Sequence, residues 1–203
     1  MNICIFASGT GSNFNAILKA VKSKKLNSKI SLLISNNPDC GAVSIAKENK
    51  TDIEIINRKK YPDLTDKQYS GIFLKTLNEH NIDLIVLCGY MKMIEKDVLK
   101  KYNNKIINIH PALLPSFGGK GMFGINVHKA VIAAGVKVSG ITIHYVNENY
   151  DEGKIIFQKC CEVSEDDDEF TLQKRVLKME HLYYWQVVRT IEDPGYGITK
   201  SGA

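Results

Sequence analysis

Asp-Leu-Ile-Val-Leu-Cys, at residues 83–88, is an almost uninterrupted apolar run of strand length. A strand that faces water on one side alternates apolar and polar residues, so this run predicts a strand covered on both faces, as in a parallel sheet. Further strand-like runs lie on either side of it, at residues 2–7, 29–35, 52–56 and 105–109. Helical patterns alternate with them at residues 13–21, 42–48, 66–79 and 96–102. This alternation predicts an α/β fold with an open, mostly parallel, Rossmann-like sheet and helices on both faces.

The pattern changes in the last third of the chain. Residues 137–146 and 154–163 are typical of two strands joined by a turn at 147–153, which predicts an antiparallel pair at the C-terminal end of the sheet. Residues 169–191 carry apolar side chains at helical spacing and predict one long closing helix. No linker or repeat interrupts the chain, so we expect a single domain over residues 1–203.

Composition narrows the class of protein. The 203 residues are 44% hydrophobic and 24% charged, which excludes a disordered or collagen-like chain. No apolar run approaches membrane length, and the N-terminus enters a strand without a basic leader, so we expect no membrane and a cytoplasmic protein. The net charge of +5 is scattered and too weak to indicate nucleic acid. The five cysteines never form a C-x-x-C spacing, which favours reduced thiols over a metal site.

Small residues fill the loop that follows the first predicted strand, Ser-Gly-Thr-Gly-Ser-Asn at residues 8–13. A glycine-rich loop that opens a helix lets backbone N–H groups reach an anion, and phosphate is the usual occupant. Phe14 breaks the G-x-G-x-x-G dinucleotide pattern, and the chain contains no G-x-x-x-x-G-K-[ST] loop. The other interpretation is a tight turn with Ser12 or Asn13 as helix cap.

A second group of polar residues ends the strand predicted at 105–109. Asn108 and His110 are two apart and therefore share a side of an extended segment, where an amide and an imidazole can stabilise an oxyanion and move a proton. Asp151 lies in the later Asp-x-Gly turn. It is either an ordinary turn carboxylate or the partner that orients His110.

The remaining candidates are weaker. Glu180 falls on an apolar helical stripe, so its carboxylate faces either a ligand cation or an internal salt bridge. The other histidines are interpreted as packing or surface groups: His80, His128, His144 and His181.

Three motifs follow one another in the chain: Ser8-Gly9-x-Gly11-Ser12-Asn13, then Asn108-x-His110-Pro111-x-Leu113-Leu114-Pro115, then Asp151-x-Gly153 ahead of Ile155-Ile156-x-Gln158. In order and spacing the chain resembles the phosphoribosylglycinamide formyltransferases, folate-dependent enzymes of purine synthesis, along essentially its whole length. The second and third motifs are shared by wider formyl-folate enzymes. Only the N-terminal loop is specific to the glycinamide ribonucleotide (GAR) substrate.

The resemblance implies formyl transfer from 10-formyltetrahydrofolate to the amine of GAR, without a metal. It assigns residues 1–110 to nucleotide and phosphate binding, and residues 111–203 to the rest of the folate site and the closing helix. It implies that Asn108, His110 and Asp151 are catalytic, stabilise the tetrahedral intermediate and shuttle protons. The implied GAR-binding residues are Gly11, Ser12, Asn13 and Glu180. The implied folate-binding residues are Tyr90, Met91, Lys92, Met93, Ile94, Ile106, Asn108, Val146 and Tyr150.

Two departures accompany the resemblance. Lys92 stands where many relatives have arginine, so a bidentate contact becomes a point charge. The loop at residues 116–124 also differs from the better-known form of the family. The alternatives are a relative that formylates another amine, a formyl-folate hydrolase, and a nucleotide-binding module that keeps only the fold. We expect small-molecule substrates, no nucleic acid, and a monomer or weak homodimer.

Overall fold

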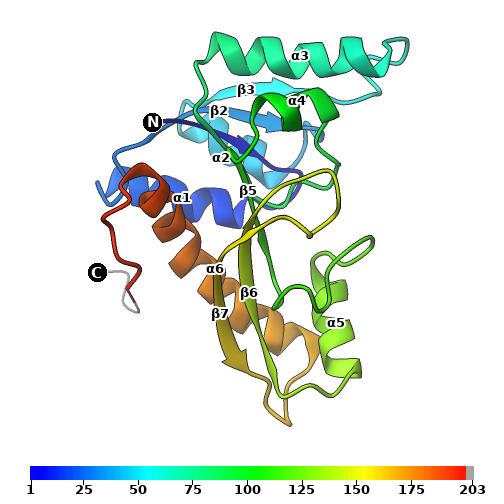
Figure 1. Cartoon of the computed structure of the whole chain (residues 1–203), viewed down its shortest axis with the longest axis vertical. Coiled ribbons are helices and arrows are strands. Elements are labelled where there is room, and N and C mark those ends of the chain that lie inside the picture. Colours follow the sequence, from blue (N-terminus) through cyan, green and yellow to red (C-terminus); the bar gives the residue numbers. More distant parts are fainter. Residues whose placement is uncertain (200–203) are drawn as a thin grey trace. The chain divides into compact units, whose positions relative to one another are not determined.

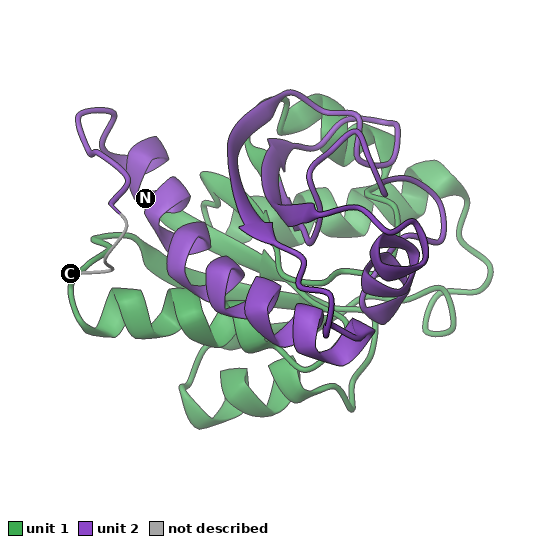
Figure 2. Cartoon of the chain, turned by 90° about the horizontal axis from the view of Figure 1, so that it is seen from below, with its two compact units in different colours: residues 1–107 green, residues 108–203 purple. Residues whose placement is uncertain are grey.

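A computed structural model describes residues 1–199 of the chain (Figure 1). Seven strands form a sheet in the order β3-β2-β1-β4-β5-β6-β7. The pairs β1–β2, β1–β4 and β2–β3 are parallel, and β6–β7 is antiparallel. The predicted fold class is therefore confirmed. By its contacts the chain divides into two compact units, residues 1–107 and 108–203, which Figure 2 colours separately.

The first unit holds four parallel strands and four helices. Its strands are β1 (Asn2–Phe6), β2 (Lys29–Ser35), β3 (Asp52–Ile55) and β4 (Leu84–Leu87). Its helices are α1 (Ser12–Lys22), α2 (Gly41–Glu48), α3 (Asp66–Glu79) and α4 (Lys96–Lys101). Every residue of β4 is buried, as the apolar run predicts for a strand covered on both faces.

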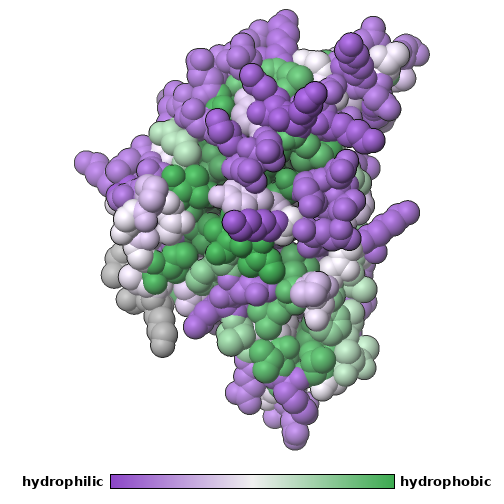
Figure 3. Space-filling view, in the orientation of Figure 1, coloured by the Kyte–Doolittle hydropathy of each residue, from purple (hydrophilic) through white to green (hydrophobic). Residues whose placement is uncertain are grey.

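The helices of this unit cover the sheet in pairs. Helix α1 contacts α2, and both contact β2, whereas α3 contacts α4. Thr65 begins α3 with a capping box in which its hydroxyl and the Gln68 side chain each bond the other's backbone N–H. The outer face of α3 is hydrophilic, as seen at the top of Figure 3. Within residues 1–199, no helix combines the length and hydrophobicity of a membrane span.

The second unit begins inside β5 (Ile106–His110), the strand that ends in the predicted polar pair. It continues with α5 (Ile125–Ala133), β6 (Val138–Tyr145), β7 (Ile155–Glu162) and α6 (Glu169–Glu192). Helix α6 packs on α5, β6 and β7. We predict no bounds for α5 from the sequence, because its nine residues follow a glycine-rich loop and present only a short apolar stripe.

The loop after β5 is fixed by one buried hydroxyl. Thr142 Oγ1, on β6, donates to Ala112 O at 2.7 Å and accepts from Leu114 N at 2.9 Å. Gln158 Nε2, on β7, donates to the same hydroxyl at 2.9 Å and to Leu114 O at 3.0 Å. Both side chains therefore lie on one face of the antiparallel pair, where they fix the direction in which the chain leaves His110.

We expect Thr142→Val to destabilise the protein by about 2 kcal/mol, because the isosteric change leaves buried backbone groups without their partner. The free energy of unfolding in urea measures this. Thr76→Val, which removes a buried hydroxyl of α3, is the matched control and should keep the loop after β5 resistant to proteolysis. An unchanged stability and an equally protected loop in Thr142→Val would contradict the assignment.

Candidate functional site

In the first unit, the glycine-rich loop lies at the carboxyl end of β1. Gly11 is the N-cap of α1 with a left-handed φ of 79°, and its backbone leaves no room for a side chain, since a Cβ there would lie 2.7 Å from Ala42 Cα. No side-chain hydrogen bond caps the helix, so the interpretation of Ser12 or Asn13 as its cap is wrong. The loop thus has the backbone form expected of an anion site.

The loop after β4 lies beside this glycine-rich loop. The chain reverses its order across the sheet between β1 and β4, which is where ligands bind in open α/β sheets. Tyr90 packs edge-on against Phe6 with ring centroids 5.2 Å apart, and burial raises the pKa of its hydroxyl. Met91 and Met93 are 47% and 45% exposed, so this loop presents two large apolar side chains at the surface. Lys92 is also exposed, whereas Ile94 and Ile106 are buried.

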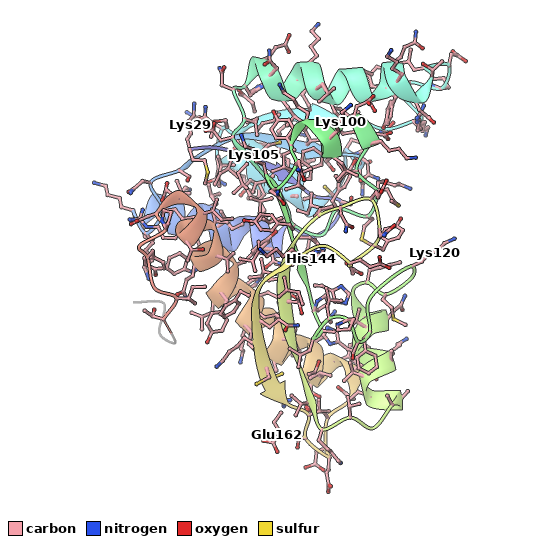
Figure 4. The ribbon with its side chains drawn as sticks, viewed as in Figure 1. Lys29, Lys100, Lys105, Lys120, His144 and Glu162 are labelled. Carbon is pink, nitrogen blue, oxygen red and sulfur yellow. The ribbon has the colours of Figure 1, made fainter. Side chains whose placement is uncertain are left out.

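The second unit gathers the predicted polar pair and turn carboxylate into one cluster. His110 Nδ1 lies 3.6 Å from Asp151 Oδ2, and His144 Nε2 lies 3.7 Å from Asp151 Oδ1. Asn108 Nδ2 lies 3.2 Å from His144 Nε2. The side chains of His110 and His144 are 4% and 2% exposed, and that of Asp151 is 14% exposed. One carboxylate is therefore shared by two buried imidazoles (His144 is labelled in Figure 4).

The hydrogen-bond partners of the two rings show which of their nitrogens carry protons. His144 Nδ1 lies 2.8 Å from Tyr145 O, a carbonyl that only accepts, so Nδ1 carries a proton. Burial lowers the pKa of His144, and the neutral ring then accepts at Nε2 from the Asn108 amide. His110 Nε2 donates to Phe117 O at 2.8 Å, while its Nδ1 faces the carboxylate. Both nitrogens of His110 thus face acceptors, an arrangement that the imidazolium satisfies fully.

Backbone geometry sets the position of Asp151. Its own φ is +58°, a left-handed conformation that aspartate tolerates better than most residues. A Cβ on Gly153 would lie 1.6 Å from Tyr145 O, so the third position of the Asp-x-Gly turn accepts only glycine. The backbone N–H of Gly119 donates to Asp151 Oδ2 at 2.9 Å. The loop after His110 therefore helps to hold the carboxylate that His110 faces.

His128, on α5, is a buried neighbour of this cluster. Its pKa is lowered to about 4 by burial and by the charge of His110. Its Nδ1 has no hydrogen-bond partner among residues 1–199. A neutral ring beside His110 leaves Asp151 as the charged group that faces it within this unit.

The other predicted residues lie around these elements. Val146 and the exposed Tyr150 precede Asp151 in its turn, and Glu180 is buried on α6. Sequence reasoning missed the contacts of His144, which it treated as a packing or surface group. The alternation of β6 was the available signal, because His144 is two residues from Thr142 and shares its face. Among residues 1–199, no group of three His, Cys, Asp or Glu side chains is placed to hold a metal.

Comparisons with known proteins agree with this architecture. The family model described as formyl transferase matches residues 1–188. The chain is 39% identical over 189 residues to the chloroplastic phosphoribosylglycinamide formyltransferase of Arabidopsis thaliana, covering 93% of this chain and 64% of that protein. It is 37% identical to the enzyme of that name from Bacillus subtilis, covering 92% of each. The chain thus spans less than two thirds of its plant relative.

A solved structure of the same name has the same fold. The phosphoribosylglycinamide formyltransferase of Bacillus halodurans superposes with a TM-score of 0.87 at 34% identity, covering 97% of this chain and 99% of that chain.

The lowered pKa of His128 predicts a pH dependence of stability. The unfolded chain binds a proton near pH 6.5, whereas the folded ring binds it only near pH 4, so stability falls as the pH drops across this window. The slope from this group is at most about 1.4 kcal/mol per pH unit. Unfolding free energies between pH 4.5 and 7.5 should therefore change less steeply in His128→Phe. His80→Phe, at the end of α3, is the control, and equal slopes in all three proteins would refute the assignment.

Proposed function

The chain belongs to the formyl transferase family, and we propose that it transfers the formyl group of 10-formyltetrahydrofolate to the amine of 5'-phosphoribosylglycinamide, giving N-formyl-GAR for purine biosynthesis. The observation that carries this proposal is the buried cluster in which Asp151 faces both His110 and His144, and Asn108 is tied to His144. The names of the relatives support the choice of substrate, and the glycine-rich loop supports a phosphate-bearing acceptor.

The cluster has the groups that acyl transfer to an amine requires. Bound 10-formyltetrahydrofolate supplies an electrophilic formyl carbon. As the amine attacks it, negative charge develops on the formyl oxygen, and donors aimed at that oxygen lower the barrier. Asn108 is one such donor, because its amide carries two N–H groups and the contact with His144 uses one of them.

His110 is the second donor and the proton carrier. In the structure its Nε2–H donates a hydrogen bond to Phe117 O. During the reaction the same N–H donates to the formyl oxygen instead, once the loop at residues 116–124 has moved Phe117 O away. Asp151 holds the ring by Nδ1 and stabilises its charged form. The imidazolium of His110 gives a proton to the departing folate nitrogen, and the proton that the attacking amine releases then restores the charge of the ring beside Asp151.

The other roles are proposed for residues of each unit in turn. The backbone at Gly11, Ser12 and Asn13 binds the phosphate of the nucleotide at the start of α1. The half-buried Tyr90 and the exposed Met91 and Met93, with the buried Ile94 and Ile106, give the pterin an apolar surface, and the exposed Lys92 adds a positive charge. In the second unit, Val146 and Tyr150 contact the folate and Glu180 contacts the nucleotide.

The reduced cysteines favour a cytoplasmic protein, which we take to be a monomer or weak homodimer.

The experiment that tests this function follows the conversion of 10-formyltetrahydrofolate to tetrahydrofolate by absorbance, with and without GAR. We expect conversion only when GAR is present. Conversion without GAR identifies a hydrolase. No conversion in either case contradicts formyl transfer to GAR, and the phosphate role of Gly11, Ser12 and Asn13 is then the first assignment to fall.

Variants of the cluster separate catalysis from binding. We expect His110→Ala and Asp151→Asn to lower kcat on the order of 10² to 10³-fold, as the loss of one oxyanion donor typically does, with GAR binding retained. His80→Ala, at the C-cap of α3 in the first unit, should keep wild-type turnover. Loss of GAR binding combined with normal turnover at saturation would overturn the assignments.

A further inference from the structure

Ser8, the first residue of the glycine-rich loop, makes contacts that the proposed function leaves unexplained. Its hydroxyl accepts a hydrogen bond from the backbone N–H of Met91 at 3.0 Å and donates to Asn36 Oδ1 at 2.5 Å. Its own backbone N–H donates to Gly89 O at 3.1 Å. One half-buried serine thus connects the loops that follow β1, β2 and β4.

The direction of these bonds is determined by chemistry. The Met91 N–H can only donate, so the serine hydroxyl must direct its proton elsewhere, and Asn36 Oδ1 receives it. Asn36 is itself held, because Asn57 Nδ2 donates to its carbonyl at 3.0 Å. The hydroxyl is therefore a fixed acceptor aimed at the segment after β4.

That segment depends on its backbone contacts. The side chains of Met91 and Met93 are about half exposed, so packing does little to locate them. Gly89, with φ of +73°, turns the chain so that the Met91 N–H points back at Ser8. On the other side of Ser8, Gly9 O accepts from Ala42 N at 3.2 Å and fixes the glycine-rich loop against α2. A displacement of either loop therefore acts on the other through Ser8.

We propose that Ser8 is a positioning residue that couples nucleotide binding to folate binding. The inference rests on the proposed function, because it takes residues 11–13 to bind the phosphate and residues 90–93 to bind the pterin. A phosphate that orders the glycine-rich loop also fixes the Ser8 hydroxyl, which then holds the backbone at Met91 in the form that receives the pterin. Each ligand consequently tightens the binding of the other by the same factor, as thermodynamic linkage requires.

The test is a calorimetric titration of tetrahydrofolate into the protein with and without saturating GAR, a pair that binds without turnover. In the wild-type protein we expect GAR to tighten tetrahydrofolate binding several-fold. Ser8→Ala should weaken tetrahydrofolate binding in the presence of GAR by roughly three- to tenfold, the typical effect of one hydrogen bond, and bring the coupling factor close to one. Ser8→Thr keeps the hydroxyl and should restore most of the coupling.

Ser35→Ala is the matched control. Ser35 ends β2 and uses its hydroxyl within its own turn, on the backbone of Asn37, so its loss should leave the coupling factor unchanged. In the transfer assay, Ser8→Ala should raise the KM for 10-formyltetrahydrofolate while kcat at saturation of both substrates falls less than about twofold.

The outcomes separate the two proposals. Failure of the wild-type protein to bind GAR or tetrahydrofolate refutes the proposed function itself. Binding of both ligands by the wild type with no coupling, or wild-type coupling in Ser8→Ala, overturns the role of Ser8 and leaves the function intact. Equal loss of coupling in Ser8→Ala and Ser35→Ala would show a general loosening of the loops, which also contradicts it.

Discussion

A single carboxylate shared by two buried imidazoles organises the second unit. Charged groups are costly to bury without partners, so the position of Asp151 depends on His110 and on the Gly119 N–H. The left-handed backbone of Asp151 and the glycine two residues later are local conditions for that position. The loop after β5, the turn after β6 and the Asn108 amide are therefore set relative to one carboxylate, and the proposed chemistry uses the same contacts.

The fold could be predicted because its strands carry strong local signals. The apolar run that became β4 is buried throughout, and the glycines and capping residues between runs mark the ends of helices such as α3, which begins at Thr65 as a capping box. The antiparallel pair β6–β7 followed from two strand-like runs and a polar turn. Helix α5 was not predicted with bounds, since tertiary packing on α6 stabilises it more than its own short apolar stripe does.

The candidate site was predictable only in part. The spacing of Asn108 and His110 placed them on one strand end, and the turn carboxylate was a possible partner for His110. The tie between Asn108 and His144 depends on the register of distant strands, which no local pattern reveals. Likewise, the link from Ser8 to Met91 joins residues 83 positions apart, so only the order β1-β4 in the sheet brings them together.

Asp151 and Asn108 determine which nitrogens of the two rings, His110 and His144, carry protons. Nitrogen-15 NMR of the imidazoles at pH 7 tests it directly, because protonated and unprotonated ring nitrogens resonate far apart. We predict that His144 carries its proton on Nδ1, toward Tyr145 O, and that its Nε2 is an unprotonated acceptor. A proton on His144 Nε2, in an ion pair with Asp151, would contradict this assignment of the protons.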